Sequence, residues 1–457
     1  MNIDFTIISL IFLILSLPSL IIYFKNKNIF CLTHIIFVIL FIGVLPIYNL
    51  VLTNEIGKNY NLISYILANF VWLLYIYIFS FFYRINYKFF SDSILINAGL
   101  KVSDWQIVTS FLLWIIFKLY LIEVYGENAF PNNRIYLNFV KLESWEFVLG
   151  SYLSALAVGA YFVYILKLLK IKQYWKNIYI TIPFIMFLIP YLFGLESNIG
   201  SRRFVLLTVL LIVIIKIHEY GFRNFIFKQK FPLIIFLVTV YFFSSLYQLV
   251  RSNYHSIEFR AGINSSDIFT KIESIGFLFI PTQEQIDDQA ETNILRDGPL
   301  RLTVELVDQI IVNNANSPFS EITLSGLKII IPSFIYTNKV MIQSDQLISK
   351  NYNIHPDGDY INLDLPTSIP VIFLADYGLI GVILAPLLLA ITFYFLYLMS
   401  TIGTNNKFPL ILFIISWIFE LTVAVESDIT SIFSIYRDFI VLFILVIFFY
   451  PRIRKIK

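Results

Sequence analysis

Residues 62–82 have the sequence LISYILANFVWLLYIYIFSFF, an apolar run without a charged side chain. A helix needs about 20 such residues to cross roughly 30 Å of hydrocarbon. Lipid offers backbone amides no hydrogen-bond partner, so a spanning segment must satisfy them within its own helix. The run therefore predicts a transmembrane α-helix.

Similar apolar blocks recur along the whole chain, which has 457 residues and is 58% hydrophobic and 14% charged. Soluble domains usually contain about 25% charged residues. We therefore predict an all-α polytopic membrane protein with about 11 transmembrane helices. The ten other blocks lie at about 4–24, 29–52, 104–124, 147–166, 177–195, 203–217, 232–250, 370–399, 408–425 and 432–450. No basic segment precedes the first block, so we expect a retained helix there and not a cleaved signal peptide.

Lysine and arginine residues favour one set of alternating short loops, with eighteen in that set and five in the other. Cytoplasmic loops of membrane proteins carry the excess of positive charge. This asymmetry predicts a multi-pass protein of the bacterial inner (cytoplasmic) membrane, with a periplasmic N-terminus and a cytoplasmic C-terminus. It also places the long polar segment between the eighth and ninth blocks on the periplasmic side.

The chain is thus expected to consist of helices one to eight in residues 1–250, a large periplasmic loop in 251–369, and helices nine to eleven in 370–457. Within the loop, apolar residues at helical spacing between Leu300 and Val312 predict a helix that lies against the bundle. The ninth block is unusually long, so its start at Pro370 to Tyr377 is interpreted as a loop or an interfacial segment.

Several kinds of chemistry have no support in the sequence. The net charge of +3 gives no general basic field, so no nucleic-acid partner is expected. The one cysteine excludes an internal disulfide, and the four histidines are too scattered for a zinc site, so we expect neither a metal nor a cofactor. Gly-x-Ser-x-Gly, phosphate-cradling glycine loops and His-Glu-x-x-His are absent, which leaves hydrolase, ATPase and metalloprotease functions without support.

Ionisable residues occur inside the predicted spans, where each costs several kcal/mol unless it is paired or faces water. Glu420 on helix ten and Arg437 with Asp438 on helix eleven lie at one predicted depth below the outer surface, and Asp376 enters at a similar depth. Lys118 and Glu123 lie in the outer third of helix four. The outer turn between helices six and seven is bracketed by Glu196, Arg202 and Arg203.

These charges have structural explanations as well as a functional one. Glu420 and Arg437 could form an ion pair between adjacent helices, Lys118 could extend toward the interface, and Arg202 with Arg203 could anchor a short helix. Together, however, the charges predict a cationic cavity that opens outward. Such a cavity suits a lipid-linked phosphate or pyrophosphate, because the planar guanidinium of arginine holds phosphate oxygens at two points.

Four short segments carry a family resemblance: Gly200-Ser201-Arg202-Arg203, Arg301-Leu302, Ile331-Pro332-Ser333 with Lys339-Val340, and Asp376-Tyr377-Gly378-Leu379-Ile380-Gly381. In these segments and in topology the chain resembles the bacterial O-antigen and oligosaccharide repeat-unit polymerases, the Wzy-type proteins. Ser333 stands where the family often has arginine, and Val340 where it often has proline.

The resemblance implies a GT-C-like architecture and a metal-independent glycosyltransferase. Such an enzyme joins lipid-linked oligosaccharide repeat units on undecaprenyl pyrophosphate at the periplasmic face, in the synthesis of O-antigen (lipopolysaccharide), capsule or another surface polysaccharide. Its partners are then the carrier-linked oligosaccharide, the lipid bilayer and, in some systems, a chain-length regulator protein. As catalytic residues we predict Arg202, Arg203, Arg301, Arg437, Glu196 and Asp376, and as substrate-binding residues Arg251, Lys339, His355 and Glu420.

Three other functions stay open at this point. An O-antigen ligase would share the fold and the leaving group but transfer the chain to lipid A core. A lipid-linked oligosaccharide flippase is a transporter, although flippases usually have shorter loops. An integral-membrane acyltransferase would need a histidine well placed within the membrane.

Overall fold

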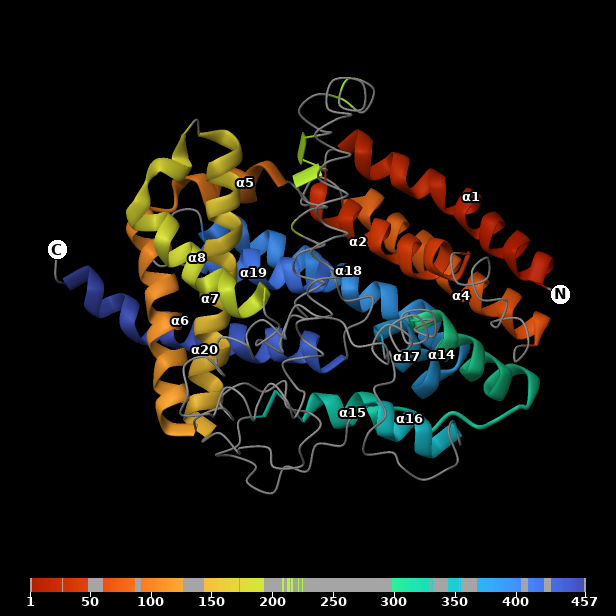
Figure 1. Cartoon of the computed structure of the whole chain (residues 1–457). Helices are drawn as coiled ribbons and strands as arrows, with labels where there is room; N and C mark the ends of the chain where they lie inside the picture. Colours follow the sequence, from red (N-terminus) through yellow and green to blue (C-terminus); the bar gives the residue numbers. More distant parts are fainter. Residues whose placement is uncertain are drawn as a thin grey trace, which may run out of the picture. The chain divides into compact units, whose positions relative to one another are not determined.

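The computed structural model is built from helices and turns, without strands in the residues that it describes (Figure 1). These are residues 2–26, 28–47, 61–86, 92–125, 144–171, 173–192, 298–328, 330–331, 344–352, 354, 368–403, 410–422 and 429–455, with isolated positions between 208 and 224. Two compact units divide the chain. The first unit comprises Met1–Ala98 and Asp297–Lys457, and the second comprises Gly99–Arg296.

Six helices are long and apolar enough to cross a membrane, so the chain is a multi-pass membrane protein by helix length and hydropathy. Each matches a predicted block. The spans are Asp4–Tyr23, Phe30–Ile47, Leu62–Ile85, Asp104–Tyr125, Val148–Lys170 and Leu379–Ser400, and two shorter apolar helices cover Ile178–Leu188 and Leu410–Thr422. The predicted blocks 203–217 and 232–250 lie mostly or wholly outside the described residues.

The first unit is assembled around helix α4. Its helices are α1 (Asn2–Asn26), α2 (Ile29–Ile39), the π-helical turn η1 (Leu40–Val44), α4 (Leu62–Asn86), α14 (Gly298–Val307), the π-helical turn η5 (Asp308–Val312), α15 (Glu321–Leu327), α16 (Ser344–Tyr352), α17 (Ile369–Tyr377), α18 (Leu379–Gly403), α19 (Leu410–Thr422) and α20 (Ile429–Lys455). Helix α4 packs against α1, α14 and α18. Trp72 and Tyr75 in its middle are fully buried.

Helix α14 and the turn η5 confirm the helix predicted against the bundle at 300–312. Their apolar residues Leu302, Val304, Leu306 and Val307 are buried. The indole Nε1 of Trp72 on α4 donates to the hydroxyl of Thr303, at 3.0 Å. Part of the large polar segment is therefore an integral piece of the first unit.

Two contacts place parts of residues 298–327 beside the starts of other helices in the first unit. The start of α4 meets η5, where Ser64 donates to Asp308 at 2.6 Å. The start of α20 lies close to α15: a Cβ added to Gly326 on α15 would lie 3.0 Å from the side chain of Ile429. Both starts follow predicted periplasmic loops, so η5 and α15 lie next to the predicted periplasmic ends of α4 and α20.

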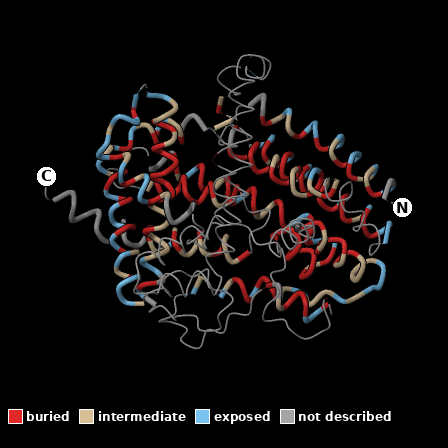
Figure 2. Tube along the Cα trace, in the orientation of Figure 1, coloured by how far each residue is buried: buried red, intermediate tan, exposed pale blue. Residues whose placement is uncertain are grey.

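The predicted ninth span is broken into two helices. The interpretation of Pro370 to Tyr377 as a loop or interfacial segment is wrong: these residues form α17, which is buried from Ile369 to Asp376 (Figure 2). Ser368 caps the helix by accepting from the amide of Val371 at 3.4 Å, and Pro370 occupies the first turn, where its missing N–H costs nothing.

Two glycines explain the break. Gly378 ends α17 with φ of 59° and ψ of −140°, a conformation that favours glycine. A Cβ on Gly381, in the first turn of α18, would overlap the carbonyl of Phe373. The Gly-x-x-Gly pattern in this chain therefore serves a tight turn between two packed helices.

Replacing Gly381 with alanine is expected to prevent this turn from closing, because the added Cβ collides with backbone that cannot move aside alone. We expect a clear loss of folded protein, measured as the monodisperse fraction after detergent extraction. Ile380→Ala is the matched control, because Ile380 is 65% exposed and should tolerate truncation. A G381A variant that extracts as well as the control would contradict this account.

The second unit contains part of α5 (Asp92–Lys101) and then α6 (Asp104–Tyr125), α7 (Ser144–Lys170), the 3-10 turn η4 (Tyr174–Lys176) and α8 (Ile178–Leu192). Helix α6 packs along both α7 and α8. Helix α5 occupies residues that the sequence analysis treated as a loop.

Candidate functional site

The described part of the predicted site lies in the first unit, on helices α14, α17, α19 and α20. It holds Arg301, Asp376, Glu420 and Arg437. The other predicted site residues, Glu196, Arg202, Arg203, Arg251, Lys339 and His355, lie outside the described residues and stay predictions.

Arg437 forms an ion pair with the next residue in the chain. Its Nε donates to Asp438 at 2.8 Å, and its Nη2 lies 2.7 Å from the same carboxylate oxygen. The side chains are 17% and 6% exposed, so the pair is largely removed from water. Arg437 is eight residues into α20, which places it about 12 Å along the helix from Ile429.

Glu420 adds a second carboxylate to this pair. Helix α19 packs against α20, and Asp438 acts electrostatically on Glu420. Two carboxylates and one guanidinium thus occur together among apolar side chains such as Phe419 and Leu421, which are buried. The predicted alternative, a Glu420–Arg437 ion pair, differs from this arrangement, because Arg437 pairs with Asp438.

The end of α19 is held by a buried histidine. His34 on α2 is fully buried, with Nδ1 3.2 Å from the carbonyl of Thr422 and Nε2 2.8 Å from the hydroxyl of Tyr75. Because a carbonyl only accepts, Nδ1 carries the proton and Nε2 accepts from the tyrosine. His34 therefore connects α2 and α4 to the helix end that carries Glu420.

Asp376 has a structural use in this fold. Its carboxylate accepts from the amides of Ile322 at 3.0 Å and Thr323 at 2.6 Å, and from the Thr323 hydroxyl at 2.5 Å. Ser320, at the N-cap position of α15, makes no capping bond with its side chain. Asp376 thus caps α15 from α17, and its predicted catalytic role stays a prediction.

Replacing Asp376 with alanine is expected to release α15, because two amides and a hydroxyl lose their acceptor. The cost should be about 2–3 kcal/mol, measured as the thermal midpoint of purified protein in detergent. Ser368→Ala is the matched control on the same helix, since it removes only one capping bond of 3.4 Å. Equal shifts for the two variants would argue against this capping role.

Arg301 lies on α14, where its Nε donates to Glu305 at 3.1 Å. The two side chains are 39% and 23% exposed. Arg301 therefore shares its charge with a carboxylate, as Arg437 does with Asp438. Glu305 was not predicted from the sequence, although its spacing of four residues after Arg301 is the usual signal for such a pair.

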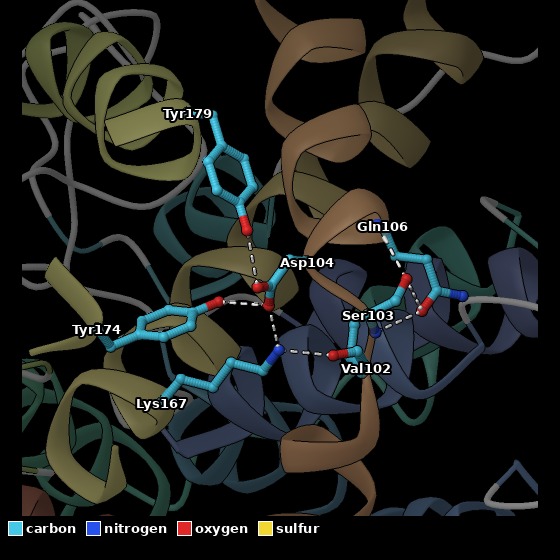
Figure 3. A network of polar contacts seen from close by, with 7 residues as sticks. All are labelled: Val102, Ser103, Asp104, Gln106, Lys167, Tyr174 and Tyr179. Carbon is cyan, nitrogen blue, oxygen red and sulfur yellow. Dashed lines mark hydrogen bonds and ion pairs between the residues drawn. The ribbon is translucent and has the colours of Figure 1, made fainter. Parts of the chain in front are cut away.

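A further polar network in the second unit was missed by the sequence analysis (Figure 3). The carboxylate of Asp104 accepts from Lys167 at 2.6 Å, from Tyr174 at 2.6 Å and from Tyr179 at 3.2 Å. Lys167 also donates to the carbonyl of Val102, at 2.7 Å. Burial and the bond to Asp104 raise the pKa of Tyr174, so this tyrosine keeps its proton and donates.

This network and a second carboxylate hold α6 to α7 at both ends. At the other end, the buried Glu146 of α7 accepts from Tyr120 at 2.8 Å and from Tyr125 at 2.5 Å.

Helix α6 starts with a capping box. The backbone N–H of Gln106 donates to Ser103 Oγ at 3.3 Å, and the backbone N–H of Ser103 donates to Gln106 Oε1 at 3.0 Å. Every acceptor and donor named here is satisfied within the unit, which indicates a structural role.

Groups of three or more histidine, cysteine, aspartate or glutamate side chains that could hold a metal ion are not found among the described residues. Comparison with models of protein families, with curated proteins and with solved structures gave no match. The functional argument therefore depends on the residues of this chain alone.

Proposed function

We propose that this protein polymerises oligosaccharide repeat units linked to undecaprenyl pyrophosphate, at the periplasmic face of the bacterial inner membrane. The proposal includes about 11 transmembrane helices in a GT-C-like arrangement, a periplasmic N-terminus and a cytoplasmic C-terminus. The best support is the group formed by Glu420, Arg437 and Asp438, which places a guanidinium and two carboxylates among apolar helices. Such groups in membrane spans usually serve a substrate or an ion.

The reaction needs a cation and a base. The acceptor hydroxyl oxygen attacks the anomeric carbon of the donor sugar, the carbon–oxygen bond to pyrophosphate breaks, and its electron pair leaves with the pyrophosphate. A carboxylate takes the hydroxyl proton. A fixed cation in a dry site stabilises the developing charge on the leaving group by about 3 kcal/mol. In this proposal Arg437, with Arg202 and Arg203, binds the pyrophosphate, and Asp438 keeps Arg437 in position.

A deletion strain tests the function directly. Loss of the gene should leave surface polysaccharide with a single repeat unit on a gel, and the wild-type gene should restore the ladder. Polymer that accumulates on its carrier would indicate an O-antigen ligase instead. Repeat units that accumulate on the cytoplasmic leaflet would indicate a flippase. Normal polymer in an Arg301→Ala, Arg437→Ala double variant would refute the arginine assignment.

A further inference from the structure

Helix α14 and the turn η5 carry a polar face that has no role in the proposed pyrophosphate site. Arg301, Glu305 and Asp308 recur at spacings of four and three residues, and all three are partly exposed. The other residues between Leu302 and Val307 are buried, because they pack against the remaining helices of the first unit. The three ionisable residues thus form one stripe along the helix, which we call the α14 stripe.

Two hydrogen bonds fix the position of this stripe along α4. Asp308 accepts from Ser64, the third residue of α4, whereas Thr303 accepts from Trp72, eight residues further along α4. Helix α14 therefore runs antiparallel to α4, with its amino end toward the middle of the span. Arg301 is seven residues before Asp308, which places it about 10 Å inward from the level of Ser64.

The partial exposure of Arg301 and Glu305 at that depth needs an explanation. The span of α4 begins at Leu62, two residues before Ser64, and the hydrocarbon core is about 30 Å thick. Charged side chains exposed to hydrocarbon at this level would cost several kcal/mol. Irregular or charged elements at membrane depth occur where they are covered by protein or line water. Arg301 and Glu305 are 39% and 23% exposed, so water is the medium that fits them.

We propose that α14 is a re-entrant helix, and that the α14 stripe lines a water-filled recess entering the membrane from the Ser64 end of α4. The stripe carries one cation and two carboxylates, a net charge of −1, and Arg301 already donates to Glu305. The proposed pyrophosphate site has a net positive charge only because Arg202 and Arg203 join the group of Glu420, Arg437 and Asp438. The stripe holds no second basic residue beside Arg301, and its accepting carboxylates and donating guanidinium suit the hydroxyl groups of an uncharged saccharide. Given the proposed function, the recess holds the sugar part of the substrate and Arg301 is a saccharide ligand.

Cysteine labelling tests the recess without any measurement of polymer. In a Cys31→Ser background, which removes the one native thiol, Glu305→Cys is compared with Ile66→Cys. Ile66 lies on α4 about 3 Å inward from Ser64, and Glu305 lies about 4.5 Å inward from Asp308; Ile66 is 46% exposed, but among apolar neighbours. A membrane-impermeant methanethiosulfonate applied to intact spheroplasts should label E305C at least about tenfold faster than I66C, because only a thiol in water forms the reactive thiolate. Equal rates, or an unlabelled E305C, overturn the recess.

Asn61→Cys separates failure of the recess from failure of the proposed topology. Asn61 is exposed and directly precedes α4. If N61C is labelled from outside and E305C is not, the recess is wrong and the topology stands. If N61C is labelled only in inverted vesicles, the periplasmic assignment in the proposed function is wrong, and the ratio of E305C to I66C in those vesicles still decides the recess.

The sign of the charge is tested at Gln309, which is partly exposed and follows Asp308. Gln309→Cys keeps all three charges of the stripe. After each rate is divided by the rate of the same reagent with a free thiol in solution, a reagent with a trimethylammonium group should react several-fold faster than one with a sulfonate, and the difference should shrink in high salt. Faster reaction with the sulfonate would overturn the saccharide assignment and favour a diphosphate.

Discussion

Replacing Arg437 with alanine is expected to abolish polymer. If this guanidinium stabilises the pyrophosphate leaving group, its removal should lower polymerisation by about 100-fold or more, as for the loss of one preorganised donor. Arg437→Lys should recover little, because an ammonium group lacks the planar fork that binds two phosphate oxygens. The measurement is the length distribution of surface polysaccharide in a deletion strain that expresses each variant at wild-type level.

A double variant separates this role from a structural one. Arg437→Ala alone removes the cation of an ion pair whose carboxylate, Asp438, is buried, which is itself destabilising. Arg437→Ala combined with Asp438→Ala removes both charges and should restore the protein level. If the double variant also restores polymer, Arg437 only supports the fold and the proposed site is wrong. If protein returns without polymer, the guanidinium is needed for the reaction.

The spans could be predicted from the sequence because hydropathy alone decides them. The block 62–82 appears as α4 over Leu62–Asn86. The break at Gly378 could not be predicted in this way, since residues on both sides are equally apolar. It depends on a positive φ and on the close approach of Gly381 to Phe373, which are properties of the packed backbone.

The candidate site was predicted only in part, for a similar reason. The shared depth of Glu420 and Arg437 follows from residue counting, but the choice of partner does not. Neighbours in a helix point about 100° apart, so sequence reasoning looked for the partner of Arg437 on the adjacent helix. The long arginine side chain instead turns back to Asp438.

The Asp104 network was missed because its members were assigned separately. Asp104 is the first residue of the predicted block 104–124, and Lys167 directly follows the predicted block 147–166. Two antiparallel apolar segments with an acid at the start of one and a base at the end of the other could have indicated the pair. The contributions of Tyr174 and Tyr179 depend on the turn η4 and had no signal in the sequence.

Replacing Asp104 with alanine is expected to give the largest loss of stability in the second unit. Lys167, with a side chain only 6% exposed, would keep its charge and lose its counterion. Breaking a buried pair typically costs about 3–5 kcal/mol. Asp104 is 30% exposed, so water replaces part of the interaction, and we expect about 2–3 kcal/mol. That corresponds to a thermal midpoint lower by roughly 5–10 °C for a unit of this size.

Asp104→Asn combined with Lys167→Met provides the decisive comparison, since replacing both members of a buried pair is often neutral. The double variant should regain most of the thermal midpoint lost in D104A, measured by intrinsic fluorescence in detergent. Tyr179→Phe is a matched control with little expected change, because Tyr179 is 60% exposed and its bond to Asp104 is the longest of the three. If the double variant is as unstable as D104A, the cost comes from lost packing and not from the unpaired lysine, and the network does not hold α6 to α7 by charge.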